Sequence, residues 1–188
     1  IVASDVNRNI VSLVNPTTGA LTILAGQDGV AGAADGIGTA ASFSRPYGCC
    51  VLPTGEILVA DQSNNKIRQI TPTGTVTTYA GTGTPGRVDT AYTSSTFNGP
   101  QDIQYNKVNG DLYVADTTGV VIRRLRSGSV LTVAGNGVLG YVEAQGTNSE
   151  YYGLEGIAVT PDRTKLIIAD GNGGLGTNFN RIRTLNLN

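Results

Sequence analysis

Short runs of alternating or wholly apolar residues fill the chain, and turn-forming residues separate them. In the second quarter of the sequence these runs are "GCCVL", "EILVA", "KIRQI" and "TVTTYA", and the intervening segments are "PTG", "DQSNN" and "TPTG". β-Branched and aromatic residues favour strands, and Pro, Gly, Asn and Asp favour turns. No segment keeps a helical periodicity. The pattern predicts an all-β protein of short antiparallel strands.

The strand pattern repeats along the chain. The phrases "IVASD", "ILVAD", "LYVAD" and "LIIAD" end at Asp5, Asp61, Asp116 and Asp170, which are 56, 55 and 54 residues apart. A second landmark, an Ala-Gly pair, keeps the same register. A fixed period of this length is the signature of a repeat architecture. The predicted repeats are residues 1–45, 46–98, 99–152 and, in part, 153–188.

Each complete repeat of about 55 residues supplies four strands. One four-stranded sheet cannot cover both of its faces, so it must stack on copies of itself. Apolar residues on both sides of "ILVA" and "LIIA" fit sheets that lie between neighbouring sheets. These features predict a β-propeller with four-stranded antiparallel blades, and a β-sandwich is the alternative.

The order of the motifs adds a family resemblance. The phrases "DGIGTAASFSRPYG", "GEILVADQSNNKIRQI" and "GTVTTYAGTG" resemble the NHL-repeat family of six-bladed β-propellers, over nearly the whole chain. The fourth repeat departs from the pattern, because "YYGLEGIAV" lacks the Pro before its first strand. The resemblance implies the propeller fold but leaves function open, since such propellers serve as interaction platforms, receptor ectodomains, RNA binders and occasional enzymes.

The number of strands is too small for a closed ring of this kind. The chain supplies three strands of a first blade, two full blades and three strands of a fourth, whereas a ring of six blades holds about 24 strands. We therefore expect an incomplete ring or arc, from a processed product or part of a longer chain. Unpaired edges and apolar faces at both ends require cover. Other polypeptide, either remaining blades of a longer chain or neighbouring copies, is the expected partner; a closed four-bladed monomer is the rival.

Two kinds of charged residue recur once per repeat. The four aspartates named above end their strands, and we expect each to accept hydrogen bonds from the backbone of the turn it opens. Metal binding or acid–base chemistry is the alternative. Arg68, Arg123 and Arg183 lie on the third strands, where they are expected to pair with the aspartates or with carbonyls of neighbouring blades. A basic stripe for an anionic partner is the alternative.

Adjacent cysteines occupy a predicted innermost strand. Successive strand residues point to opposite faces, so we expect Cys49 and Cys50 to be small buried residues, one on each face. A strained disulfide between them and an intermolecular bridge are the alternatives.

The amino-acid composition indicates which kinds of partner and which location are expected for the protein. Charged residues make up 14% of the chain, against about 25% in an average soluble protein. This favours an extracellular or cell-surface protein. A net charge of −1 gives no field to hold nucleic acid, and no apolar run approaches the roughly 20 residues of a membrane span. We therefore expect neither nucleic-acid binding nor a membrane span.

The chain contains no histidine, which limits the classes of enzyme to which it could belong. Histidine-based triads, ordinary catalytic zinc sites and histidine proton shuttles are all removed. The histidine-bound zinc of amidating-lyase relatives is therefore not transferable. Lactonase-like propellers hold calcium through carboxylate and amide oxygens, and the candidates here are Asp102, Asn109, Glu155 and Asn172. They follow no signature, so we expect no cofactor, with calcium as the alternative.

The sequence favours a non-catalytic scaffold for protein–protein interaction or extracellular assembly. A glycan or small-ligand binding module and a calcium-dependent lactonase-like hydrolase are the alternatives. The final repeat carries about six extra residues within "GNGGLGTNFN", and insertions into a repeat often carry individual function. We expect this loop, with Gly171, Asn172, Asn178 and Asn180 as candidate contact residues, to protrude from the blade.

Overall fold

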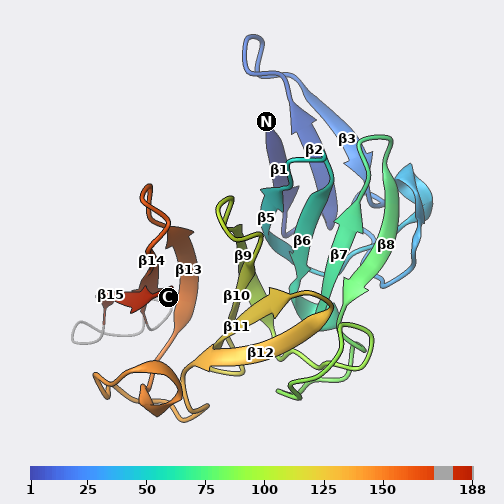
Figure 1. Cartoon of the computed structure of the whole chain (residues 1–188). Helices are drawn as coiled ribbons and strands as arrows, with labels where there is room; N and C mark the ends of the chain where they lie inside the picture. The colour runs from blue at the N-terminus through green and yellow to red at the C-terminus, as the bar shows by residue number, and fades with distance from the viewer. Residues whose placement is uncertain (172–179, 188) are drawn as a thin grey trace.

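Four antiparallel sheets stand side by side along an open arc (Figure 1). The structure, a computed structural model, describes residues 1–171 and 180–187. The first sheet consists of β1 (Val2–Asp5), β2 (Ile10–Val14) and β3 (Leu21–Ala25). The second consists of β5 (Pro46–Val51), β6 (Ile57–Asp61), β7 (Lys66–Ile70) and β8 (Thr75–Ala80). A two-residue strand, β4 (Gly36–Ile37), pairs with the outer edge of β8.

The other two sheets follow the same order from the inner strand outward. The third consists of β9 (Pro100–Tyr105), β10 (Leu112–Asp116), β11 (Val121–Arg126) and β12 (Ser129–Ala134). The fourth consists of β13 (Leu154–Val159), β14 (Lys165–Asp170) and β15 (Arg181–Asn186). Short 3₁₀ turns, η1 (Gly38–Ala40), η2 (Gln62–Asn64) and η3 (Gly146–Asn148), lie in the connections.

The predicted fold class is confirmed, because the sheets are blades of an incomplete β-propeller. The predicted blade strands appear in three, four, four and three per sheet, in simple antiparallel order. Within residues 1–171 and 180–187, the first sheet has no inner strand and the fourth has no outer one. Strand β4 was not predicted, because two residues of a glycine-rich connection carry no alternating pattern.

The core consists of three apolar layers, each between two adjacent blades. Between the second and third blades, Leu58, Ala60 and Ile67 pack against Ile103 and Val114. Equivalent layers join the first blade to the second and the third blade to the fourth. Strands β6 and β10 are buried along their whole length, which explains why they are continuous apolar runs.

The two cysteines lie on opposite faces of β5, as predicted, but both are half-buried rather than buried. Cys49 packs against the layer between the first and second blades, and Cys50 against the layer between the second and third. Both thiols are free. Burial raises the pKa of both thiols, that of Cys50 to about 12. The thiolate is therefore scarce at neutral pH, and neither residue has the character of a reactive cysteine.

This raised pKa predicts slow alkylation of Cys50 in the folded chain. With a pKa of about 12 the thiolate fraction at pH 8 falls by roughly three orders of magnitude relative to an ordinary thiol. We expect iodoacetamide to modify Cys50 slowly in buffer and at the normal rate in denaturant, as measured by peptide mass spectrometry. Rapid modification in buffer would show that the strand is open or the thiol ionised.

Candidate functional site

A buried arginine organises the second blade. The Arg68 side chain is fully buried, and its Nη1 atom lies 2.9 Å from Oδ2 of Asp61. Its Nη2 atom lies 2.7 Å from Oδ1 of Asp35, which comes from the connection between the first and second blades. The guanidinium lies 5.3 Å from the ring centroid of Phe43 and also donates to the carbonyls of Ala34 and Ser42. One side chain thereby ties a strand to the loop that precedes its blade.

The same arginine clamp recurs in the next two blades. The second clamp joins Arg123 to Asp116, Asp89, the Phe97 ring and the carbonyls of Val88 and Thr96. The third joins Arg183 to Asp170, Glu143, the Tyr151 ring and the carbonyls of Val142 and Glu150. Because each clamp fulfils the same internal role, these residues are structural parts of the repeat.

The sequence contained a signal for the acids of the connections. Asp35, Asp89 and Glu143 are each 54 residues apart, the period of the blades. These acids lie outside the recurring strand motifs, because the third member is a glutamate and the surrounding connection has no strand pattern. Their recurrence beside the arginines shows that the clamp is a three-part unit with a carboxylate on each side.

The hydrogen bonds of the strand-ending aspartates differ from the prediction for Asp61 and Asp116, whereas most of the turn that Asp170 opens lies outside the described residues. Within the described ranges, Asp5 accepts from the backbone of its own turn, through the N–H groups of Asn7 and Arg8, and Asp61 accepts from its own turn through the side-chain amide of Asn64. Asp61 accepts from the N–H of Ser44 and Asp116 from the N–H of Asn98, both in the loop that leads into the inner strand of the same blade. Asp170 does the same with Tyr152 and Gly153.

The reason for this correction lies in the composition of the blades. In the three later blades an arginine and an entering loop are present, and together they direct the carboxylate toward the loop. In the first blade, Ser12 occupies the position of the arginine, and no described inner strand lies beside β1. Asp5 therefore accepts from the N–H groups of its own turn. Burial raises the pKa of Asp61, and that of Asp116 to about 6, against the opposing effects of the N–H donors and arginines.

Another buried carboxylate links two inner strands. Asp102 of β9 accepts through Oδ1 from the N–H of Ile103, and through Oδ2 from the N–H of Ile157 on β13, both at 2.8 Å. Burial raises the pKa of this carboxyl, and the two N–H donors oppose the rise. Asp102 therefore joins the third and fourth blades through the backbone.

The candidate calcium ligands do not form a cluster in the described ranges 1–171 and 180–187. Asn109 accepts from the N–H of Asp111 in a surface turn, whereas Asp102 lies on an inner strand. No group of three or more carboxylate or thiol side chains within these ranges could hold a metal ion. Asn172 and Asn178 of the candidate interaction loop lie outside the described residues, so only Gly171 and Asn180 at its ends are placed.

The two end faces of the arc are exposed, although their residues are apolar. Ile182 of β15 pairs with Ala169, in the position that Ile122 occupies opposite Ala115. Ile182 is 74% exposed, whereas Ile122 and its counterpart Ile67 are 0% exposed. The difference shows that the face which elsewhere meets the next blade has no neighbouring blade among the described residues.

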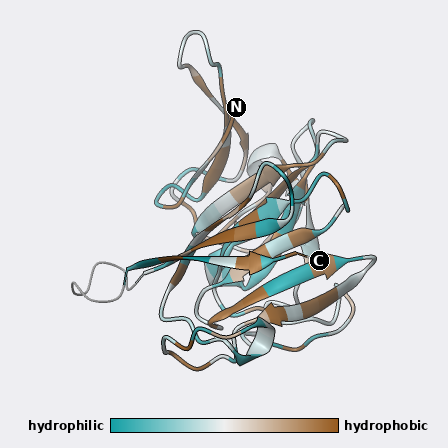
Figure 2. Cartoon of the chain, turned by 60° about the vertical axis from the view of Figure 1, so that its left-hand side comes forward, coloured by the Kyte–Doolittle hydropathy of each residue, from teal (hydrophilic) through white to brown (hydrophobic). Residues whose placement is uncertain are grey.

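The first blade also exposes an apolar side chain, on the face that in later blades meets the preceding blade. Leu21 pairs with Val14, in the position of Val76 and Val130 in the next two blades. Leu21 is 62% exposed, and the two valines are 1% and 0% exposed. Figure 2 shows this hydrophobic first sheet at one end of the molecule, with its β2–β3 hairpin extending away from the other sheets.

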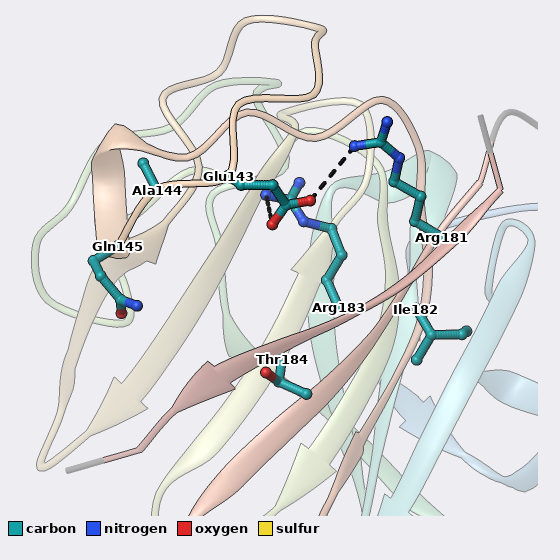
Figure 3. Close-up of a pocket in the computed structure, with 7 residues that line it drawn as sticks. All are labelled: Glu143, Ala144, Gln145, Arg181, Ile182, Arg183 and Thr184. Atoms are coloured by element: carbon teal, nitrogen blue, oxygen red, sulfur yellow. Dashed lines mark hydrogen bonds and ion pairs between the residues drawn. The ribbon is translucent and has the colours of Figure 1, made fainter. Parts of the chain in front are cut away.

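A groove of about 750 Å³ runs along the open edge of the fourth blade. It is lined by Glu143, Ala144 and Gln145 from the connection and by residues 181–184 of β15. Figure 3 shows Glu143 between Arg181 and Arg183, with an interaction to each, while Ile182 points away from it. The two end faces and this groove are the candidate functional sites.

Comparison with known proteins supports the same architecture. No family model matches the chain. The chain is similar to NHL repeat-containing protein 2 of Homo sapiens, with 34% identity over 99 residues, which is 52% of this chain and 13% of the human protein. The described part of the chain contains no helix that is long and apolar enough to cross a membrane.

Solved structures share the fold at low sequence identity. A structural genomics protein of unknown function from Bacteroides thetaiotaomicron superposes with a TM-score of 0.72 and 21% identity, covering 95% of this chain and 43% of its own. An auxiliary nutrient binding protein from the same species superposes with a TM-score of 0.69 and 20% identity, covering 97% and 44%. The chain thus spans less than half the length of these propellers.

Proposed function

We propose that this chain, which is similar to NHL repeat-containing protein 2, acts as a non-catalytic scaffold whose two open ends bind other polypeptide. The partner is either the remaining blades of a longer chain or neighbouring copies. The low content of charged residues supports an extracellular or cell-surface location for this scaffold.

The observation that carries the proposal is the exposure of Leu21 and Ile182 at positions that are buried in every fully covered blade. Full burial of one such side chain contributes about 1.5–3 kcal/mol. Each end also exposes an unpaired strand edge, β1 at one end and β15 at the other. Edge pairing combined with apolar burial is the usual way in which β-sheets bind polypeptide.

The non-catalytic part of the proposal rests on the chemistry of the side chains. The recurring carboxylates are used in arginine clamps and backbone hydrogen bonds, and the chain has no histidine to act as a base. The second residue of each inner strand differs in chemical type between blades: it is Tyr47 in β5, Gln101 in β9 and Glu155 in β13. This variety supports a scaffold better than a conserved catalytic ring.

Sedimentation velocity tests the proposal on the 188-residue chain. We expect the weight-average mass to rise above 19.4 kDa with concentration, because the apolar end faces associate when no native partner covers them. Ile182→Asp and Leu21→Asp are each expected to reduce this association. Val108→Asp is the matched control, because Val108 is 77% exposed but lies in the turn between β9 and β10, away from both end faces.

A wild-type chain that remains a 19.4 kDa monomer at all concentrations, with both terminal sheets folded, would refute binding at the end faces. Equal effects of Val108→Asp and Ile182→Asp would show that association is a general surface property, which would also count against the proposal.

A further inference from the structure

The outer strand of each complete blade contributes a threonine to the arginine clamp. In the second blade, the N–H and Oγ1 of Thr78 on β8 each lie 3.3 Å from a carboxylate oxygen of Asp35. Thr78 is the cross-strand partner of Arg68. Asp35 therefore bridges the arginine of the third strand and the threonine of the fourth.

The third blade has the same arrangement with shorter distances. The N–H of Thr132 on β12 donates to Asp89 at 2.9 Å, and its Oγ1 donates at 3.0 Å. Thr132 is the cross-strand partner of Arg123. The repetition in two blades shows that the carboxylate has two functions, one toward the buried arginine and one toward the outer strand.

In the described part of the fourth blade, the carboxylate contacts the buried arginine but no outer strand. Oε2 of Glu143 lies 3.3 Å from Nη2 of Arg183, and Oε1 lies 3.5 Å from Nη1 of Arg181. Among the described residues no strand pairs with the outer edge of β15, so no threonine reaches Glu143. The side chain of Glu143 is 65% exposed, and it faces the groove of Figure 3.

We propose that the groove along β15 accepts an extended strand of the pattern Val-x-Thr-x-Ala-Gly, whose threonine binds Glu143 and which comes from polypeptide outside residues 1–188. This inference rests on the proposed function and specifies the partner at one end. The pattern is shared by the two outer strands that make complete clamps, in "VTTYAG" at 76–81 and "VLTVAG" at 130–135.

The register of the complete blades assigns each position of this strand. The threonine faces Arg183, as Thr78 faces Arg68 and Thr132 faces Arg123. The alanine faces Ile182, and the valine faces Leu185 by the same correspondence. The final glycine is required by geometry, because Gly135 has φ of +87° and a Cβ there would lie 2.4 Å from the carbonyl oxygen of Val120.

A second copy of the described chain is a poor source of this strand. Its two strands of the right pattern, β8 and β12, are already paired within their own blades. The remaining outer strand, β3, carries Ile23 at the threonine position, opposite Ser12. An isoleucine side chain offers Glu143 no hydroxyl donor, so a strand from outside residues 1–188 fits the groove better.

Peptide binding tests the inference directly. The probe is a fluorescein-labelled peptide of residues 128–135, "GSVLTVAG", and its matched control has valine in place of the threonine. We expect the threonine peptide to bind the chain about tenfold or more tightly, because a hydrogen bond to a charged group contributes about 1.5–3 kcal/mol. Fluorescence anisotropy measures the affinities, and hydrogen exchange should show new protection at β15.

A variant of the protein locates the binding. Glu143→Gln should weaken the threonine peptide and remove most of its advantage over the valine peptide, because the charged acceptor is lost. Asp28→Asn is the control, since Asp28 is an exposed carboxylate in the first connection, paired with Arg8. Thermal unfolding of Glu143→Gln, whose side chain is largely exposed, verifies that the variant is folded.

Three results would overturn the inference. They are the absence of peptide binding, equal affinity for the two peptides, and self-association of the chain that both an excess of the threonine peptide and Glu143→Gln abolish. The last result would assign the groove to a second copy. A chain that self-associates through Ile182 but does not bind the threonine peptide would disprove this strand assignment and leave the proposed function standing.

Discussion

Replacing Arg123 with alanine is expected to lower the free energy of unfolding by about 3–5 kcal/mol, the range for removal of one partner from a buried ion pair. Arg123 and Asp116 are both fully buried, and their charged atoms lie 3.2 Å apart. The variant also loses the donors to the carbonyls of Val88 and Thr96. Urea unfolding, followed by circular dichroism, measures the loss.

The exposed ion pair of the first blade provides the matched control. Arg8 contacts Asp28 with about half of each side chain in solvent, so the free energy of unfolding should fall far less in Arg8→Ala than in Arg123→Ala. Equal costs for the two variants would contradict a structural role for the clamp.

The cost of Arg123→Ala should also depend on pH. Burial raises the pKa of Asp116 to about 6 even with the arginine present, and removal of Arg123 takes away an effect that lowers it. A carboxyl with a raised pKa binds protons more strongly in the folded state, so acidification stabilises the folded variant relative to its unfolded state. We expect the difference between wild type and variant to shrink as the pH falls from 8 through 6.

Ile122→Asp is expected to cost about 4 kcal/mol or more and to unfold a marginal chain, because it buries an unpaired carboxylate between the third and fourth blades. The same change at the equivalent position 182 should cost only about 0.5 kcal/mol, because that side chain is mostly in solvent. Urea unfolding at low protein concentration measures both, so that association does not contribute. Similar costs for the two variants would show that Ile182 is covered in solution.

The sequence predicts the blades well because their determinants are local and repeated. Strands such as β6 and β10 carry a continuous apolar run ending in aspartate, and the fixed period places each in its sheet. The connections are less predictable, because glycine-rich segments take their conformation from contacts distant in sequence. Strand β4 is an example, since it forms only where Gly36 meets Val76 of β8.

The candidate site was predictable only in part. The missing strands followed from the repeat count, and so did the expectation of open ends. The pairing of each arginine with its strand-ending aspartate was foreseen as one of two interpretations. The third component, represented by Asp89 and Glu143, recurs with the period of the blades, but its pairing with an arginine required the structure, because the two side chains are 34 and 40 residues apart and share no local pattern. The direction of the aspartate hydrogen bonds likewise depends on the loop that enters each blade.

An experimental structure of the native polypeptide that contains residues 1–188, with all of its partners, tests the central claim most directly. The decisive quantity is the exposed fraction of Leu21 and Ile182, which are 62% and 74% exposed in the arc. We predict that other polypeptide buries both side chains to the level of Val130 and Ile122, each 0% exposed. A structure in which both side chains remain in solvent, with the open edges of β1 and β15 still without a partner strand, would contradict the account.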